Sequence, residues 1–265
     1  MQTGYLELDR LTKGLSPGDL ILLSGETAVG KTAFALNIAL HEARHGGAVA
    51  IFSLETTKER LSERLISTAT SVPYRDIATR NLTSGEWSGL VRGTIGLLRA
   101  HLYLDDSIHV EINDMRERAR RTSIERLRTG LNPLSLIVVD YLQLLPPRGY
   151  GVGDRRRTVA ANLRGLKRLA ENLGVPVLVI SQLDRDSDRH LRPDKRPSLA
   201  DLGELEHFPN YADTVIFLYR DECYNPDSDD KGIAEVIVAR QQLGPVGRVR
   251  LAWMPDTGRY ASLVR

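Results

Sequence analysis

The chain has 265 residues, which is long enough to bury a substantial core without the support of disulfides or structural metals. Hydrophobic residues make up 42% and charged residues 26%, close to the averages for soluble globular proteins, and the formal net charge of +2 excludes a strongly charged surface overall. Cys223 is the sole cysteine, so internal disulfides and multi-cysteine metal sites are excluded. No signal peptide or membrane-spanning run is present, and we expect a soluble protein of the cytoplasm with no membrane partner.

Strand-like and helical segments alternate along the chain. Continuous apolar runs, typical of strands covered on both faces of a parallel sheet, occupy residues 20–24, 48–54, 136–140, 175–181 and 214–219. Helices are predicted over residues 32–44, 58–70, 84–100, 111–127 and 159–172. Thr83 with Glu86 has capping-box spacing, and Ser198 with Asp201 has a weaker version.

This alternation predicts an α/β fold with a mostly parallel, twisted sheet flanked by helices. Residues 233–241 and 248–253 surround the turn sequence LGPVG and predict an antiparallel C-terminal hairpin at the sheet edge. The sequence shows no repeat or linker, so we expect one domain over residues 1–265. Two polar or Pro/Gly-rich loops, 146–154 and 184–197, follow the carboxyl ends of strands, where such sheets bind ligands.

A phosphate-binding loop is predicted between the first strand and the first of these helices. The pattern G-x-x-x-x-G-K-[ST] is matched by Gly25, Glu26, Thr27, Ala28, Val29, Gly30, Lys31 and Thr32, and Ala33 continues the helix. Backbone N–H groups and the helix N-terminus in this motif hold phosphates, and we expect ATP as the ligand. Lys31 is expected at the β- and γ-phosphates, with the Thr32 hydroxyl as a ligand of Mg²⁺.

Polar residues at the ends of three other strands are candidates for the rest of this site. Asp140 ends an apolar strand in the manner of a Walker B carboxylate and is expected to complete the Mg²⁺ site. Glu55 follows the strand 48–54, which we expect to lie beside the first strand, and it could activate the water. From position alone, Glu55 could equally be a glutamate favoured in the first turn of the next helix. Gln182 could sense the γ-phosphate.

Several longer strings resemble the C-terminal motor domain of the DnaB family of replicative helicases, which has a RecA-like fold. They are TGYLELDRLTKGLSPGDL, VAIFSLE, LIVVDYLQLL, VPVLVISQLDR, ADTVIFLYRDECYN and DKGIAEVIVARQQLGPVGRVRL, together spanning about residues 3–260. FSLE, DYLQL and SQL in this order are specific to the family, whereas the phosphate loop alone is not.

The resemblance implies an ATP-hydrolysing DNA helicase that encircles single-stranded DNA as a hexameric ring, with ATP between subunits. It implies that Lys31 and Thr32 bind phosphate and Mg²⁺, that Glu55 is the catalytic base, and that Gln182 is the sensor. Arg64 matches an arginine near the nucleotide. Loader or primase proteins are candidate partners. The family's N-terminal helical collar has no counterpart here, which fits either an excised domain or a short natural protein.

Two departures from the family pattern concern residues expected at subunit and DNA contacts. The family's Lys-Gln-Arg reads Arg240-Gln241-Gln242 here, so Gln242 replaces the usual finger arginine, and we expect Arg240 to take over that role. The loop Asp-Leu-Arg-Glu-Ser-Gly reads Asp201-Leu-Gly203-Glu204-Leu-Glu206, which lacks the arginine. Gly203 and Glu204 remain DNA-binding candidates through the backbone, although the electrostatic case for this loop is weaker.

A basic patch and a histidine pair are further candidates. The patch follows the Asp140 strand and suits phosphate contacts with single-stranded DNA, although a solvated helix face has the same composition; it contains Arg148, Arg155, Arg156, Arg157, Arg164, Lys167 and Arg168. His41-Glu-Ala-Arg-His45 matches H-E-x-x-H, but it lies at a helix end before Gly46-Gly47, and we expect no zinc there.

Two alternative functions stay open. One is another RecA-like ATPase, such as a recombinase, which would form filaments on DNA instead of closed rings. The other is a nucleotide-binding assembly module with little catalysis, which Gln242 keeps open and a DNA-stimulated ATPase assay would separate from a motor.

Overall fold

The computed structural model describes residues 1–146, 155–183, 192–205, 211–242 and 244–263. The side chains of Arg155 and of residues 203–205 also lie outside the described part. Three of the DNA-binding candidates are affected: Arg148 falls outside the described residues altogether, and nothing is described of the side chains of Arg155 and Glu204.

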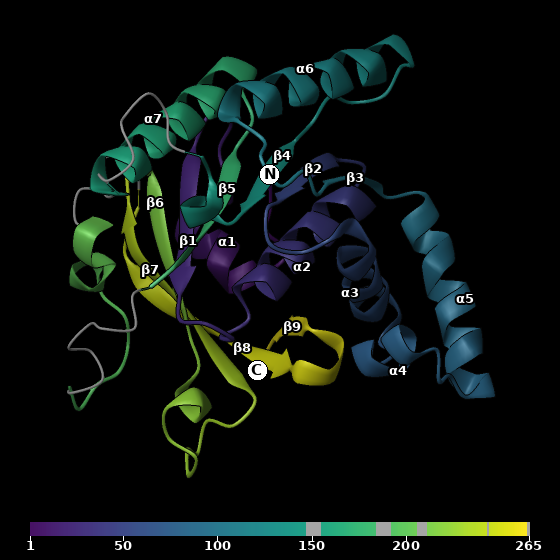
Figure 1. Ribbon diagram of the computed structural model, residues 1–265. Helices are drawn as coiled ribbons and strands as arrows, with labels where there is room; N and C mark the ends of the chain where they lie inside the picture. The colour runs from purple at the N-terminus through teal and green to yellow at the C-terminus, as the bar shows by residue number, and fades with distance from the viewer. Residues whose placement is uncertain (147–154, 184–191, 206–210, 243, 264–265) are drawn as a thin grey trace.

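The described residues form one sheet of nine strands (Figure 1). Its order is β3-β2-β4-β5-β1-β6-β7-β8-β9. The first six strands in this order are parallel to one another, and the last three, β7, β8 and β9, are antiparallel to their neighbours. The strands are β1 Leu20–Gly25, β2 Ala48–Ser53, β3 His101–Asp105, β4 Leu136–Asp140, β5 Val177–Gln182, β6 Thr214–Tyr219, β7 Ile233–Gln241, β8 Gly247–Met254 and β9 Arg259–Ser262.

Helices cover both faces of the parallel part of the sheet (Figure 1). One face carries α1 Leu6–Thr12, α2 Lys31–Arg44 and α3 Lys58–Thr70, with α4 Tyr74–Thr79 and α5 Ser84–Leu98 outside them. The other carries α6 Ile112–Arg128 and α7 Arg155–Leu173. Short 3-10 helices are η1 Leu142–Leu144, η3 Leu199–Leu205, η5 Asp221–Cys223 and η6 Pro255–Thr257.

The two helical layers explain why the strands are apolar at successive positions. Ile21 and Leu23 pack into the core beneath α2, whereas Leu20 and Leu22 pack into the core beneath α7. Since alternate side chains of a strand point to opposite faces, both faces are filled only if every residue is apolar. All six residues of β1 are buried.

The predicted sheet with an antiparallel C-terminal edge is confirmed, as are the five predicted strands, with shifts of at most two residues at their ends. The Thr83 capping box is also present: the Glu86 N–H donates to Thr83 Oγ1 at 3.3 Å, and the Thr83 N–H donates to Glu86 Oε2 at 2.7 Å. The predicted helix 84–100 ends at Leu98, and the chain then forms β3. Strands β3 and β9 and helices α1 and α4 were not predicted from the sequence.

One expectation about the sheet was wrong. Strand β2 does not lie beside β1, because β4 and β5 separate them. Strand β2 pairs instead with β4, with Ser53 opposite Asp140. Glu55 therefore reaches the site from beside the Walker B strand.

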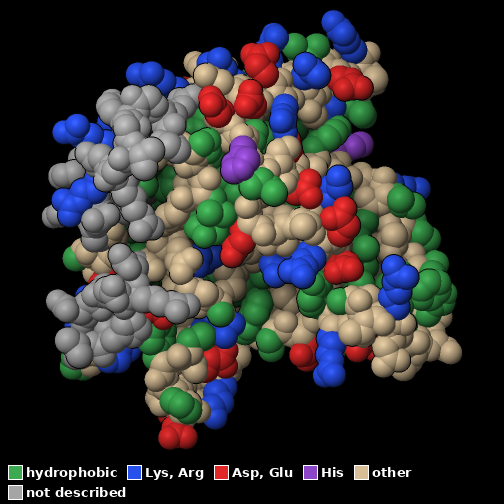
Figure 2. All heavy atoms as spheres, viewed as in Figure 1, with side chains coloured by type: hydrophobic (Ala, Val, Ile, Leu, Met, Phe, Trp, Pro, Cys, Tyr) green, Lys and Arg blue, Asp and Glu red, His purple; other side chains and the backbone are tan. Residues whose placement is uncertain are grey.

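Helix α5, at the right of Figure 1, carries a row of large exposed apolar side chains, and Figure 2 shows hydrophobic side chains gathered at the same place. These are Trp87, Val91, Ile95 and Leu98, of which Leu98 is 82% exposed. Their spacing of three or four residues puts them on one face of the helix. In the described part of the chain, no helix combines the length and the apolar character needed to cross a membrane.

Candidate nucleotide-binding site

The predicted phosphate loop connects β1 to α2, as the sequence pattern requires. Ala28 and Gly30 have φ angles of 63° and 104°, so the loop turns through the left-handed region just before α2 begins at Lys31. At Gly30 a Cβ atom would lie 2.2 Å from the Tyr260 hydroxyl, which itself lies 3.3 Å from the Val29 and Gly30 carbonyl oxygens. A residue without a side chain is therefore required there for both conformation and space.

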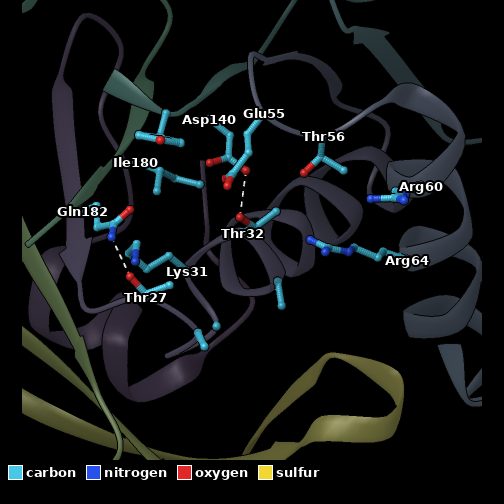
Figure 3. Close-up of a pocket in the computed structure, with 14 residues that line it drawn as sticks. Thr27, Lys31, Thr32, Glu55, Thr56, Arg60, Arg64, Asp140, Ile180 and Gln182 are labelled. Atoms are coloured by element: carbon cyan, nitrogen blue, oxygen red, sulfur yellow. Dashed lines mark hydrogen bonds between the residues drawn. The ribbon is translucent and has the colours of Figure 1, made fainter. Parts of the chain in front are cut away.

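A cavity of about 500 Å³ opens above this loop (Figure 3). Thr27, Ala28, Gly30, Lys31, Thr32 and Ala33 line it from the loop and from the start of α2. The opposite side is lined by Glu55, Thr56, Arg60, Arg64, Asp140, Tyr141, Ile180 and Gln182. The structure thus brings together Lys31, Thr32, Glu55, Arg64, Asp140 and Gln182, which the sequence analysis had selected from five segments of the chain.

Thr32 and Asp140 are suited to hold a divalent cation. The Thr32 hydroxyl donates to Asp140 Oδ2 at 2.7 Å. Adjacent oxygen ligands in an octahedral Mg²⁺ site lie about 3.0 Å apart, given Mg–O distances of about 2.1 Å. Burial raises the pKa of Asp140 above its usual range, against the Thr32 hydrogen bond, and the nearby charge of Glu55 adds to the rise. A cation at this point would stabilise both carboxylates, so the residues present fit Mg²⁺.

Lys31 lies across the loop that precedes it. Its ammonium group donates to the carbonyl oxygens of Gly25 at 2.9 Å and Glu26 at 2.6 Å. Burial lowers the pKa of Lys31 to about 8, against the opposing charges of Asp140, Glu55 and Glu26. Anionic groups entering the cavity would stabilise the charged ammonium.

Gln182 occupies the end of β5 and reaches the phosphate loop. Its side-chain amide donates to Thr27 Oγ1 at 2.5 Å, as the dashed line in Figure 3 shows. A second glutamine, Gln143 of η1, donates from Nε2 to the Gln182 carbonyl at 2.9 Å and to Ser181 Oγ at 2.9 Å. Gln143 lies within DYLQL but was not among the predicted site residues. This pair connects the segment after β4 to the end of β5.

Two arginines of α3 form the outer side of the cavity (Figure 3). Arg64 was predicted, and its positive charge opposes the rise in the pKa of Asp140. Arg60 was missed, although a spacing of four residues places it on the same face of α3 as Arg64. Arg60 is exposed at the cavity entrance.

Arg240 lies beside the amino-terminal ends of the parallel strands, whereas the phosphate loop follows the carboxyl-terminal end of β1. Strand β6 runs parallel to β1, and β7 runs antiparallel to β6 with Gln241 opposite Thr214, the first residue of β6. Arg240 donates to the Ala212 carbonyl at 3.4 Å, and the Gln242 amide donates to Asp213 Oδ1 at 2.7 Å. Neither residue lines the cavity of its own chain.

The basic patch is divided between two roles. Arg156 and Arg157 are exposed in the first turn of α7, at the edge of the sheet where the phosphate loop lies. Lys167, further along α7, donates to Asp213 Oδ2 at 2.8 Å and to the Gly18 carbonyl at 2.9 Å. Arg164 donates to the Tyr211 hydroxyl at 3.0 Å. Lys167 therefore stabilises the fold at the amino-terminal ends of the parallel strands.

The Gly203 and Glu204 candidates lie in η3. At the start of this helix, Asp201 accepts a hydrogen bond from the Ser198 N–H at 2.7 Å.

The histidine pair of the H-E-x-x-H match lies at the C-terminal end of α2. The His41 and His45 rings pack against each other with centroids 4.1 Å apart. Within the described ranges, no group of three or more His, Cys, Asp or Glu residues is arranged to hold a metal ion.

The phosphate loop, the carboxylate at the end of β4 and the parallel sheet with its antiparallel edge define a RecA-like P-loop NTPase. The family model described as DnaB-like helicase C terminal domain matches residues 1–262, and the chain belongs to this family. Replicative DNA helicase DnaB of Geobacillus stearothermophilus is 40% identical over 264 residues, covering 99% of this chain and 56% of that protein. Replicative DNA helicase DnaC of Bacillus subtilis is 38% identical over 264 residues, with the same coverage of 99% and 56%.

Solved structures agree with this assignment. One that is described as an ATPase domain has a TM-score of 0.90 at 33% identity, covering 99% of this chain and 90% of that one. A DnaB-like replicative helicase, described with its interactions with primase, has a TM-score of 0.90 at 33% identity, covering 99% of this chain and 61% of that one. The chain spans about half the length of the curated relatives, 56% in both proteins named above.

Proposed function

We propose that this chain is the ATP-hydrolysing motor of a replicative DNA helicase, acting in the cytoplasm on single-stranded DNA as a ring of six identical subunits. The observation that supports this most directly is the arrangement of Thr32, Asp140 and Glu55 around one cavity above the phosphate loop. Family membership over residues 1–262 supports the choice of a DNA helicase over other P-loop proteins.

The residues of the cavity divide the work of hydrolysis. The Thr32 hydroxyl and the Asp140 carboxylate hold Mg²⁺, which neutralises phosphate charge when bound. Lys31 and the loop backbone from Gly25 to Thr32, with Ala33 behind it, bind the β- and γ-phosphates, and Arg64 lies beside the nucleotide. Glu55, exposed just after β2, accepts a proton from the attacking water. Gln182 senses the γ-phosphate and is connected to Thr27 of the loop.

A cation from a neighbouring subunit completes the site. Arg240 lies at the far edge of its own sheet, so it reaches a phosphate only in the cavity of another copy. An arginine supplied in trans stabilises the charge that develops in the transition state. Gln242 carries no charge and is hydrogen-bonded to Asp213 within its own chain, which leaves Arg240 as the cation of this segment.

The DNA strand is proposed to contact the edge of the sheet that also carries the phosphate loop. Arg155, Arg156 and Arg157 begin α7 at that edge, and Arg148 precedes them in the chain. Arginines at such a position neutralise backbone phosphates without reading sequence. Gly203 and Glu204 of η3 contribute backbone groups. A primase or a loader protein is a further proposed partner; a related structure is described with its interactions with primase.

The test compares Glu55→Gln with Glu59→Gln, an exposed glutamate of α3 that does not line the cavity. Phosphate release is measured with and without single-stranded DNA, and ATP binding is measured separately. Glu55→Gln should keep ATP binding and lose hydrolysis by about 100-fold or more, since a general base contributes about 10²–10⁴-fold. Glu59→Gln should behave as wild type. A Glu55→Gln protein that hydrolyses ATP at the wild-type rate would contradict the assignment.

Two outcomes would favour the other functions. ATP binding by the wild-type protein without DNA-stimulated hydrolysis would indicate an assembly module. Filaments on single-stranded DNA in electron micrographs, in place of closed rings, would indicate a recombinase-like ATPase.

A further inference from the structure

A second pocket, of about 280 Å³, lies at the end of α2 remote from the phosphate loop. The N-terminal segment, the C-terminal parts of α2 and α3, and β9 surround it. Its lining includes Tyr5, His41, Arg44, His45, Arg259 and Tyr260. None of the residues that line the nucleotide cavity lines this pocket.

Two arginines converge on this pocket without a carboxylate partner. Arg44 donates to the Ala69 carbonyl at 3.3 Å, and Arg259 donates to Ser71 Oγ at 3.3 Å. No ion pair among the described residues involves either of them. Burial lowers the pKa of Arg44, and the positive charge of Arg259 lowers it further. The pocket therefore contains two guanidinium groups that are not paired with any described carboxylate.

Two acidic side chains, those of Asp9 and Glu42, lie near enough to His41 for their charges to act on its pKa. Asp9 accepts hydrogen bonds from the Thr3 N–H at 2.8 Å, the Thr3 hydroxyl at 2.7 Å and the Gly4 N–H at 3.3 Å. These bonds hold Asp9 on the N-terminal turn. It thus fixes one side of the pocket without pairing with either arginine.

Tyr5 provides a second, independent observation. Its side chain is stacked on Phe34, with centroids 5.3 Å apart, and the residue is only 5% exposed. Tyr5 lines the pocket, and no described residue hydrogen-bonds to its hydroxyl. Burial raises the pKa of Tyr5, and the nearby positive charge of Arg259 lowers it by a smaller amount. The Tyr5 hydroxyl is therefore available to donate a hydrogen bond to a group in the pocket.

The position of these groups at helix ends does not account for them all. Cations in the last turn of α2 are favoured by the helix dipole, which explains Arg44 and His41. It does not explain Arg259, which comes from β9, or the Tyr5 hydroxyl. The two arginines and the hydroxyl have in common that each donates hydrogen bonds to anions.

We propose that this pocket binds a phosphate-sized oxyanion, held by the guanidinium groups of Arg44 and Arg259 and by the Tyr5 hydroxyl. Arginine matches the geometry of phosphate oxygens and carries its charge at all physiological pH values. A volume of about 280 Å³ is below the usual size of sites that enclose drug-sized ligands, about 300–1,000 Å³, so it suits a small anion or a single phosphate group. His41 and His45 line the same pocket and report on its occupancy.

The test uses histidine side-chain NMR of the full chain, saturated with a non-hydrolysable ATP analogue and Mg²⁺ so that every phosphate position of the first site is occupied. Inorganic phosphate is titrated at constant ionic strength, with chloride as the control. We expect saturable shifts of the His41 and His45 signals with phosphate alone. In the double variant Arg44→Gln/Arg259→Gln the affinity should fall at least tenfold. Arg128→Gln, an exposed arginine at the end of α6, should leave it unchanged.

A milder variant separates binding from folding. Tyr5→Phe keeps the ring stacked on Phe34 and should weaken phosphate binding by roughly tenfold, the effect of losing one hydrogen bond to a charged group. A parallel titration with AMP distinguishes the sources of the phosphate: binding of AMP indicates a nucleotide phosphate, and binding of inorganic phosphate alone indicates the free ion. The proposal is overturned if chloride gives the same shifts, if phosphate gives no saturable shift, or if the double variant binds as wild type does.

Discussion

The ion pair between Arg196 and Glu235 should be one of the strongest single contributions of a surface segment to stability. Arg196 donates from Nε and Nη2 to the two carboxylate oxygens of Glu235, at 2.7 Å and 2.6 Å. The Glu235 side chain is 6% exposed and that of Arg196 31%. The guanidinium group also lies over the Tyr219 ring, 5.2 Å from its centroid. This contact attaches the chain after residues 184–191 to β7.

The magnitude follows from what Arg196→Met would leave behind. A buried carboxylate would lose its bidentate partner, a change that costs about 3–5 kcal/mol in folded proteins. Arg248, which lies 3.8 Å from Glu235 but is 61% exposed, would compensate in part, so we expect the low end, about 3 kcal/mol. An unfolding entropy of about 2.1 cal/mol/K per residue gives ~0.56 kcal/mol/K for this chain, and the thermal midpoint should fall by about 5 °C.

Thermal and urea unfolding, followed by circular dichroism, would measure this for Arg196→Met, Glu235→Gln and the double variant. Because one contact is removed in all three, the double variant should be less destabilised than the sum of the singles, by about 1.5 kcal/mol or more. Arg128→Met serves as the control for loss of an exposed arginine. Additive single effects, or an Arg196→Met cost no larger than that of Arg128→Met, would show that the pair is not coupled as the structure indicates.

Three further results are expected. Gly30→Ala should weaken nucleotide binding by about tenfold, because a left-handed conformation costs about 1–2 kcal/mol with a side chain and the new methyl group meets the Tyr260 hydroxyl. Adding Tyr260→Phe should restore part of the affinity. An unchanged dissociation constant for Gly30→Ala would count against this geometry. Arg240→Ala should lower ATP turnover of the assembled protein by orders of magnitude with little change in ATP binding, and a normal turnover rate would rule out its role in trans. At Asp201, burial opposes ionisation, but hydrogen bonds from Arg192 and from Ser198 hold the pKa below its usual value of 3.8. The ionised carboxylate therefore adds stability above about pH 4, and this stability is lost as the pH falls through the lowered pKa of Asp201. The difference in stability between wild type and Asp201→Asn should therefore shrink in acid. A difference that does not depend on pH would contradict this.

Much of the fold was predictable because burial on both faces leaves a clear pattern. The strands β1, β2, β4, β5 and β6 are apolar at nearly every position, and each was found within two residues of its bounds. The missed strands lack this pattern: the residues of β3 are half-buried or exposed at the edge of the sheet, and β9 has only four residues. Strand order was beyond reach, since local sequence does not specify which strands pair, and β2 was therefore placed beside β1 wrongly.

The nucleotide site was predictable to the extent that its residues follow strand ends. Lys31, Glu55, Asp140 and Gln182 all come within a few residues of such an end. Arg60 and Gln143 were not found, because their role depends on the cavity and on the approach of η1 to β5. Lys167, in contrast, was included among the candidates for DNA contact because it lies in a basic run. Its ammonium group is paired with the buried Asp213.

The reversal of chain direction at β7 has a consequence for how copies of this protein can associate. It places the phosphate loop and Arg240 at opposite edges of one sheet. A contact that joins them brings unlike surfaces of two copies together. Where a twofold axis does not repeat this contact within the same pair, the interface is head-to-tail. Every copy then has a donor side and an acceptor side, and the rotation between successive copies alone determines whether the series closes on itself or continues as a helix.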